Sequence, residues 1–196
     1  MYPVFERFDI ASVTRLRPKP LRIPRFLLDV HLGTLAGKLR LLGFDTLYHR
    51  ARSDAELASI AERENRILLT KDRQLLMRNQ VSRGLFIRNT KTRKQIFEVI
   101  ERLDLYEMIK PLSRCSICNG PIDRLSATQL DEPGIAEKIP EGVLSWCSVF
   151  FQCSECGRIY WKGSHYDKII EFIGEIKSHK AHTMREVSDL LESGPE

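Results

Sequence analysis

Three aspartates in the first half of the chain lie where a parallel α/β fold gathers its functional groups. Asp29 follows the apolar run 26–28, Asp72 follows the apolar run 67–70, and Asp54 stands at the start of a helical pattern. Parallel strands bring their carboxyl ends, and the starts of the helices that follow them, to one edge of a sheet. We therefore expect the three carboxylates to face one cleft.

Clustered carboxylates at such an edge have a specific chemistry. Like charges repel one another unless a divalent cation neutralises them, and oxygen ligands favour Mg²⁺ or Mn²⁺. A metal ion held in this way polarises a phosphodiester and lowers the pKa of a bound water molecule. Together, Asp29, Asp54 and Asp72 predict phosphodiester hydrolysis; singly, Asp54 and Asp72 also suit helix caps.

The cysteines form a second group of residues with a recognisable chemistry, because four of the five lie in two Cys-x-x-Cys pairs. They are Cys115, Cys118, Cys153 and Cys156. Residues 1–24 lack the apolar core of a secretory signal, so this spacing favours zinc ligands over disulfides. Four thiolates complete a tetrahedral shell, and we predict a structural Zn²⁺ site. The remaining Cys147 is expected to be a small buried residue.

The apolar pattern predicts the elements that position these residues. Residues 26–28 form a buried strand, and the helical spacing from Leu32 to Leu42 ends at Gly43, which suits a helix end. Further strands are predicted at 46–48, 67–70 and 85–87, a short helix through Leu75 and Leu76, and two helices behind capping boxes (Ser53 with Glu56, Thr92 with Gln95). This alternation predicts a small doubly wound parallel sheet.

The second half of the chain has a different composition. Gly120 and Gly157 follow the two cysteine pairs and are expected to let backbone amides turn toward the thiolates. Residues 149–152 and 158–161 predict a β-hairpin around the second pair, and the segment 128–143 is expected to be a loop. Helical periodicity returns over residues 167–176 and 184–191.

The charge is unevenly distributed. Lys and Arg outnumber Asp and Glu by 23 to 13 over residues 1–114, a net charge of +10, whereas residues 115–196 carry 8 against 13, a net charge of −5. The basic part indicates a polyanionic partner, with a merely solvated surface as the alternative. Lys38, Arg40, Lys71 and Arg73 are the candidates for phosphate contact. Asp45 falls at the opposite sheet edge, where we expect a turn rather than a catalytic role.

Several motifs together carry a family resemblance that covers about residues 25–167. The opening Phe26-Leu27-Leu28-Asp29 with Leu32-Gly33 and Leu42-Gly43-Phe44-Asp45 resembles the PIN-like RNase family named after the C-terminal domain of the Mut-seven exonuclease. Ser53-Asp54-x-Glu56-Leu57 and the segment Ile67 to Arg73 resemble its next two motifs. The segments around the cysteine pairs, 113–120 and 153–165, resemble the zinc ribbon that follows it.

The resemblance implies a metal-dependent ribonuclease with Asp29, Asp54 and Asp72 as its acids. Asn89 stands where PIN nucleases often carry a further acid, so it is the candidate auxiliary residue. The implied division is a basic, proline-containing arm (1–24), a PIN-like nuclease domain (25–110), a β-rich zinc ribbon (111–166) and a C-terminal helical segment (167–196).

Two other functions fit the same sequence. One is a non-catalytic RNA-binding or ribosome-associated adaptor; the other is the nuclease half of a toxin–antitoxin pair, against which the appended ribbon argues. The expected partners are RNA and, beyond it, the ribosome or RNA-processing proteins. No run of eighteen apolar residues occurs, so we expect no membrane partner and a cytoplasmic location.

Overall fold

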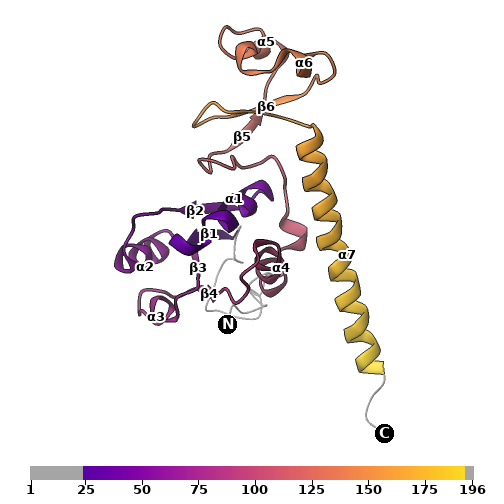
Figure 1. The fold of residues 1–196 in the computed structure, drawn as a ribbon. Helices are drawn as coiled ribbons and strands as arrows, with labels where there is room; N and C mark the ends of the chain where they lie inside the picture. Colours follow the sequence, from indigo (N-terminus) through magenta and orange to yellow (C-terminus); the bar gives the residue numbers. More distant parts are fainter. Residues whose placement is uncertain (1–23, 193–196) are drawn as a thin grey trace, which may run out of the picture. The chain divides into compact units, whose positions relative to one another are not determined.

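The computed structural model describes the backbone of residues 24–192 and the side chains of residues 24–180. The predicted basic arm lies, except for its last residue, outside this range. The chain folds as two compact units, the first ending at Asn119 and the second beginning at Gly120. Residues 111–119, predicted as the start of the ribbon, thus belong to the first unit. Figure 1 labels helices and strands of both units.

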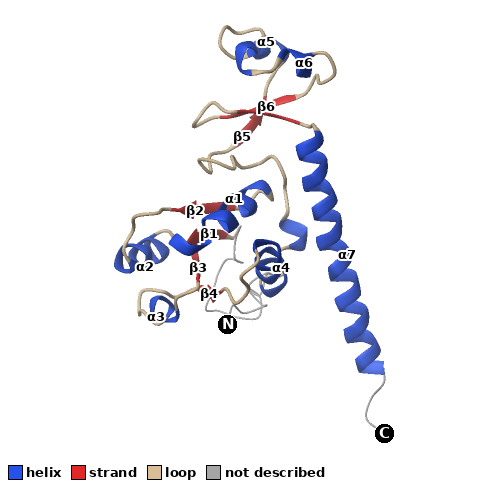
Figure 2. Ribbon diagram, in the orientation of Figure 1, coloured by secondary structure: helices blue, strands red, loops and turns tan. Residues whose placement is uncertain are grey.

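The first unit contains a four-stranded parallel sheet in the order β2-β1-β3-β4 (Figure 2). Its strands are β1 (Arg25–Leu28), β2 (Asp45–Tyr48), β3 (Ile67–Thr70) and β4 (Gly84–Phe86). From β1 the chain proceeds to β2 on one side, then crosses to β3 and β4 on the other. The strand order therefore reverses between β1 and β3, which is where open α/β sheets bind ligands.

Helices lie on both faces of this sheet, as the doubly wound prediction requires. They are the 3₁₀ helix η2 (Val30–Leu32), α1 (Gly33–Leu41), α2 (Asp54–Arg63), α3 (Arg73–Leu76), α4 (Thr92–Arg102) and the 3₁₀ helix η3 (Tyr106–Met108). Leu27 and Leu68 pack against Leu57 of α2 and Leu75 of α3. The helices α1 and α4 contact each other and bury their apolar residues as well.

The two predicted capping boxes have different outcomes. At α2 the box is confirmed: the Ser53 side chain accepts the Glu56 N–H, and the Glu56 carboxylate accepts the Ser53 N–H at 2.8 Å. At α4 the prediction is wrong. Lys91 occupies the N-cap without a side-chain hydrogen bond, and Gln95 is buried, its amide directed to the Asn89 carbonyl at 3.0 Å.

The second unit is built on a three-stranded antiparallel sheet in the order β5-β6-β7. The predicted hairpin is confirmed as β6 (Phe150–Cys153) and β7 (Ile159–Trp161), and β5 (Ile122–Arg124) adds an unpredicted third strand. The segment expected to be a loop contains short helices instead: α5 (Ala127–Leu130), η4 (Ala136–Lys138) and α6 (Glu141–Leu144). Their turns bury Leu125, Ile135 and Ile139 against Phe150.

The last described element is one long helix, α7 (Ser164–Glu192), which joins the two predicted helical stretches. Within the described residues, none of the helices combines the length and apolar character needed to span a bilayer.

Candidate active site and metal centre

Asp29 and Asp72 flank the point where the strand order reverses. Asp29 is only 4% exposed, and its Oδ1 accepts the His31 N–H at 2.8 Å. Its Oδ2 accepts the Lys71 N–H at 3.0 Å and a short hydrogen bond from the Thr70 hydroxyl. The same Thr70 Oγ1 accepts the Asp72 N–H at 2.8 Å. One threonine thus connects the ends of the two central strands.

The helix-cap alternative applies to Asp72 and not to Asp54. The Asp72 Oδ1 accepts the Gln74 N–H at 2.7 Å and caps α3. Asp54 is the first residue of α2, whose cap is Ser53, and it is exposed. Within the part of the chain described here, neither the Asp54 carboxylate nor the Asp72 Oδ2 accepts a hydrogen bond. These oxygens can therefore accept a ligand, whereas the carboxylate of Asp29 is held in one orientation by its hydrogen bonds.

The donor set suits a hard divalent cation, but the three acids are not drawn into one cluster. Carboxylate oxygens are the ligands that Mg²⁺ and Mn²⁺ favour. Among the side chains of residues 24–180, however, the group brought close enough to hold a metal consists of the four cysteines. The structure therefore links Asp29 to Asp72 through Thr70 and leaves Asp54 on a neighbouring helix.

The candidate phosphate ligands differ in exposure. Lys38 is exposed on α1, and Lys71 is half-buried beside Asp29. The Arg73 guanidinium lies 5.1 Å from the centre of the Phe86 ring, a cation–π contact that holds it beside the end of β4. These three cations are compatible with a phosphate-binding role.

Arg40 corrects the sequence interpretation. It is 7% exposed, and its Nε donates to the Thr46 carbonyl at 2.8 Å while its Nη1 donates to the Ile117 carbonyl at 2.6 Å. Burial lowers its pKa, against the opposing charges of Cys115 and Cys118. Arg40 therefore binds the backbone of the first cysteine pair and is not exposed to a substrate phosphate.

Asn89 is held by an acid that the sequence interpretation missed. Its side-chain amide donates to Glu98 Oε2 at 2.9 Å, and the Arg88 and Asn89 N–H groups donate to the same carboxylate. Burial alone would raise the pKa of Glu98, but these hydrogen bonds outweigh it and lower the pKa. The sequence signal was a glutamate within the buried stripe of α4, next to Ile96 and Val99.

The turn predicted at Asp45 is wrong. Asp45 instead lies at the centre of a buried ion network at the amino edge of the sheet. It begins β2, is 8% exposed, and accepts Arg66 Nη1 at 2.8 Å, Arg25 Nε at 3.1 Å and Asn119 Nδ2 at 2.8 Å. Burial would raise its pKa, but the hydrogen bonds and the charge of Arg66 lower the pKa to about 2. Asn119 Oδ1 also accepts the Thr46 N–H at 2.7 Å, which satisfies the edge of β2.

The four paired cysteines come together as the sequence predicts. The Sγ atoms of Cys115, Cys118, Cys153 and Cys156 all lie within 4.8 Å of one another. Sulfurs bound tetrahedrally at about 2.3 Å from zinc would lie about 3.8 Å apart, so the cluster could hold a metal such as zinc. The fifth cysteine, Cys147, is half-buried at the border of the second unit's core.

The turns that shape the cluster differ from the expected glycine pair. The left-handed residue after each pair is Asn119 (φ 74°) in the first and Gly157 (φ 67°) in the second. Gly120 is needed for space instead, because a Cβ there would lie 2.9 Å from the Cys153 Sγ. An asparagine tolerates the left-handed conformation better than most residues, and here its side chain also binds Asp45.

The chain combines a parallel α/β sheet that has acids at its carboxyl edge with an antiparallel sheet and a four-cysteine cluster, the architecture that the resemblance to the PIN-like RNase family predicted. The family model described as Mut7-C RNAse domain matches residues 24–173, and the chain belongs to this family. Membership indicates a nuclease-type function with RNA as the substrate. Searches of curated proteins and of solved structures found no significant match.

Proposed function

We propose that the chain is a metal-dependent ribonuclease that hydrolyses RNA phosphodiesters at the carboxyl edge of the parallel sheet. The observation that carries this proposal is the pair Asp29 and Asp72 on adjacent central strands, linked by Thr70 at the point of strand reversal. Ligand sites in open α/β sheets form at this point. The same segments lie within the match to an RNase family.

Asp29, Asp54 and Asp72 would hold Mg²⁺ or Mn²⁺, which when bound polarises the phosphodiester and lowers the pKa of water. Asp29 needs no reorientation, since hydrogen bonds to both its oxygens already fix the carboxylate. Asp54 is unrestrained and exposed. Lys71 and Arg73 lie beside Asp72 in the chain and bind substrate phosphate, with Lys38 as a further contact and Asn89 as an auxiliary polar group.

The four cysteines bind structural Zn²⁺ in this proposal, and the ribbon they stabilise aids the binding of RNA or of a protein partner. Cysteines that serve as ligands rather than disulfides are typical of reducing compartments, which supports a cytoplasmic location.

A second function, that of an RNA-binding adaptor for the ribosome or for RNA-processing proteins, is favoured by one specific observation. The three aspartates are not drawn into a metal-binding group among residues 24–180. An adaptor would use the basic charge of residues 1–114 without cleaving RNA.

Incubation of zinc-loaded protein with labelled single-stranded RNA, with and without Mn²⁺ or Mg²⁺, tests the proposal. The informative variant is Asp54→Asn, because this exposed side chain accepts no hydrogen bond within the described part of the chain. Glu62→Gln, exposed on the same helix, is its matched control. We expect divalent-dependent cleavage that Asp54→Asn loses and Glu62→Gln retains. A wild-type protein that binds RNA but never cleaves it would favour the adaptor.

A further inference from the structure

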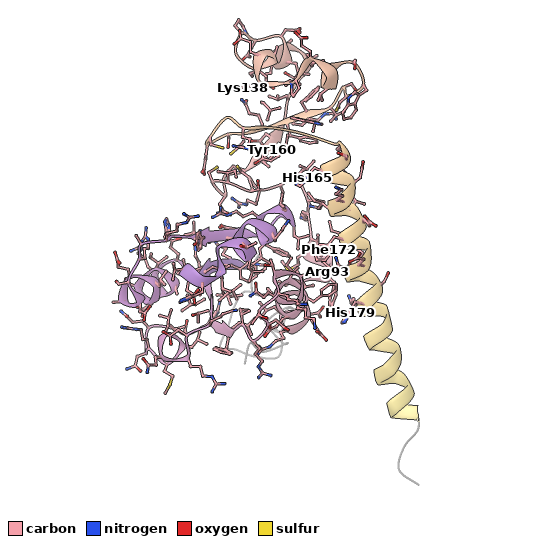
Figure 3. All side chains as sticks on the ribbon, in the orientation of Figure 1. Arg93, Lys138, Tyr160, His165, Phe172 and His179 are labelled. Carbon is pink, nitrogen blue, oxygen red and sulfur yellow. The ribbon has the colours of Figure 1, made fainter. Side chains whose placement is uncertain are left out.

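The carboxyl edge of the parallel sheet carries a strong excess of cations beyond the predicted phosphate ligands. Arg50 and Arg52 follow β2, and four cations without an acid occupy residues 88–94 after β4. All four residues are exposed, but Arg93 (labelled in Figure 3) already makes an interaction of its own, so Arg88, Lys91 and Lys94 are the candidates for ligand binding. The densest positive charge at this edge therefore lies in the loop after β4 and the first turn of α4.

The loop after β4 is held in place by hydrogen bonds to two buried side chains of α4. Glu98, 8% exposed, accepts the Arg88 N–H at 3.0 Å and the Asn89 N–H at 3.1 Å. Gln95, 5% exposed, donates to the Asn89 carbonyl at 3.0 Å. The backbone that carries Arg88 and Lys91 is therefore held in place while their side chains remain in solvent, an arrangement that costs little entropy on binding.

The same cations do not serve the stability of α4. The amino end of a helix carries partial positive charge and favours acids. The first turn of α4 contains no acid, and its N-cap is Lys91 with no side-chain hydrogen bond. By contrast, α2 begins with a capping box and with Asp54 and Glu56 in its first turn. The positive charge at the start of α4 is thus unfavourable for the helix itself, which indicates that it serves another purpose.

The position of the loop suits a substrate held at the proposed catalytic acids. β4 pairs with β3, and β3 pairs with β1. At about 4.8 Å per strand, the end of β4 lies about 5 Å from the strand that precedes Asp72 and about 10 Å from the strand that precedes Asp29. These separations match a phosphate or two on either side of a scissile bond.

We propose that residues 88–94 form the principal phosphate-binding surface for the RNA substrate, with Arg88, Lys91 and Lys94 as its cations. This inference rests on the proposed function for the identity of the ligand, and it names the surface that holds that ligand. The contact is to the phosphate backbone, so binding depends on salt and only weakly on base sequence. Arg73, held against Phe86 at the end of β4, extends the surface toward Asp72.

The test compares two charge-matched triple variants of the full, zinc-loaded chain. The loop variant is Arg88→Gln/Lys91→Gln/Lys94→Gln; the control is Arg63→Gln/Arg78→Gln/Lys110→Gln, which removes three cations from segments away from this edge. Binding of single-stranded RNA is measured without Mg²⁺ or Mn²⁺ over a range of salt concentrations. For three lost phosphate contacts the salt slope of log K should fall by about 2, and Kd at moderate salt should rise by about tenfold or more.

The control variant should change Kd by less than about twofold and leave the salt slope as it is. The loop variant should also melt at the same or a higher temperature, because removing cations from the start of a helix favours it. Equal weakening in both triples, or wild-type binding by the loop variant, overturns the proposal. If the wild-type protein cleaves no RNA while the loop variant still loses binding, the nuclease proposal fails and the phosphate-binding surface stands. If the loop variant binds and cleaves RNA normally, the surface proposal fails and the nuclease proposal stands.

Discussion

The two edges of the parallel sheet carry their charges in opposite ways. At the amino edge, Asp45 is buried and bound by Arg66, Arg25 and Asn119. At the carboxyl edge, Asp54 is exposed and accepts no hydrogen bond from the described residues, and the side chains of cations such as Arg88 and Lys91 are exposed to solvent. Among the described residues, guanidinium groups bind the buried Asp45 of the amino edge. The buried Asp29 of the carboxyl edge is bound by two backbone N–H groups and the Thr70 hydroxyl, with His31 Nδ1 at 3.5 Å.

The difference has a physical meaning. A buried charge is tolerated only when partners replace its lost hydration, so the amino edge must be complete for the chain to fold. Charges left in water cost little and contribute little to stability. They are available to a ligand, which can gain from them at the moment of binding. We therefore assign structural work to the amino edge and substrate work to the carboxyl edge.

The largest effect should come from the four-cysteine metal centre, near whose first pair Arg40 binds the carbonyl of Ile117. We expect one tightly bound zinc per chain, with a contribution to folding on the order of 10 kcal/mol. Cys153→Ser should lose the metal and unfold residues 120–163 of the second unit, while the first unit keeps most of its helical circular dichroism. Metal analysis of protein purified without chelators measures the stoichiometry, and absence of zinc there would refute this prediction.

The second effect belongs to Asp45. Asp45→Asn leaves the buried guanidinium of Arg66, whose side chain is 4% exposed, without its carboxylate. We expect a loss of about 3 kcal/mol in the free energy of unfolding, measured by urea denaturation. Turnover per folded molecule should stay the same, because Asp45 lies at the edge away from the proposed acids. A variant that is stable but inactive would reverse our assignment of the two edges.

The third effect is the mirror image, at Asp72. Asp72→Asn keeps a side chain able to cap α3 but removes a negative charge from the proposed metal site. Divalent-dependent cleavage should fall on the order of 100-fold or more, since a metal ion supplies several kcal/mol to the transition state. The melting temperature in chelator should be equal or higher, and salt-dependent RNA binding should persist. Full cleavage by this variant would remove the centre of the nuclease proposal.

The sequence predicted the elements whose signals are local. The apolar runs gave all four parallel strands, and the Ser53–Glu56 capping box gave the start of α2. It failed where a side chain is decided by a distant partner. The sequence around Arg40 suggests a surface charge, because nothing local indicates its hydrogen bond to the carbonyl of Ile117. Asp45 suggests a turn residue, because its partner Asn119 lies 74 positions away in the sequence.

The candidate site divides along the same line. The spacing of the cysteine pairs was sufficient to predict their cluster, because Cys-x-x-Cys geometry is set within each turn. The places of Asp29 and Asp72 followed from strand order, since parallel strands end at one edge. The link through Thr70 did not, because any of several side chains at a strand end can make such a bond. Glu98 was missed because two of its partners are backbone N–H groups, those of Arg88 and Asn89, which leave no signal in the residue types.

The smallest predicted effect concerns the pH dependence of the amino-edge network. The folded-state pKa of Asp45 is about 2, against an ordinary value of 3.8. A carboxylate whose pKa is lower in the folded state stabilises the protein at pH values above its ordinary pKa. That contribution is lost as the pH falls from the ordinary pKa to the folded-state pKa. Asp45 should therefore contribute about 2 kcal/mol above pH ~4 that disappears between pH ~4 and ~2.

Acid also protonates thiolates and releases zinc, and it titrates Glu64 and Glu98, whose pKa values are lowered too. The losses at the thiolates and at Glu98 are shared by wild type and Asp45→Asn, whereas Glu64 shares Arg25 and Arg66 with Asp45. Both proteins therefore carry Glu64→Gln, and the informative quantity is the difference between their two free energies of unfolding. That difference should be constant above pH ~5 and narrow by about 2 kcal/mol as the pH falls toward 2. Urea denaturation of both proteins at matched pH measures it. A gap that stays constant down to pH ~2.5 would mean that the Asp45 carboxylate is no more acidic in the folded chain than in the unfolded one, and the amino edge would then lose its distinction from the carboxyl edge.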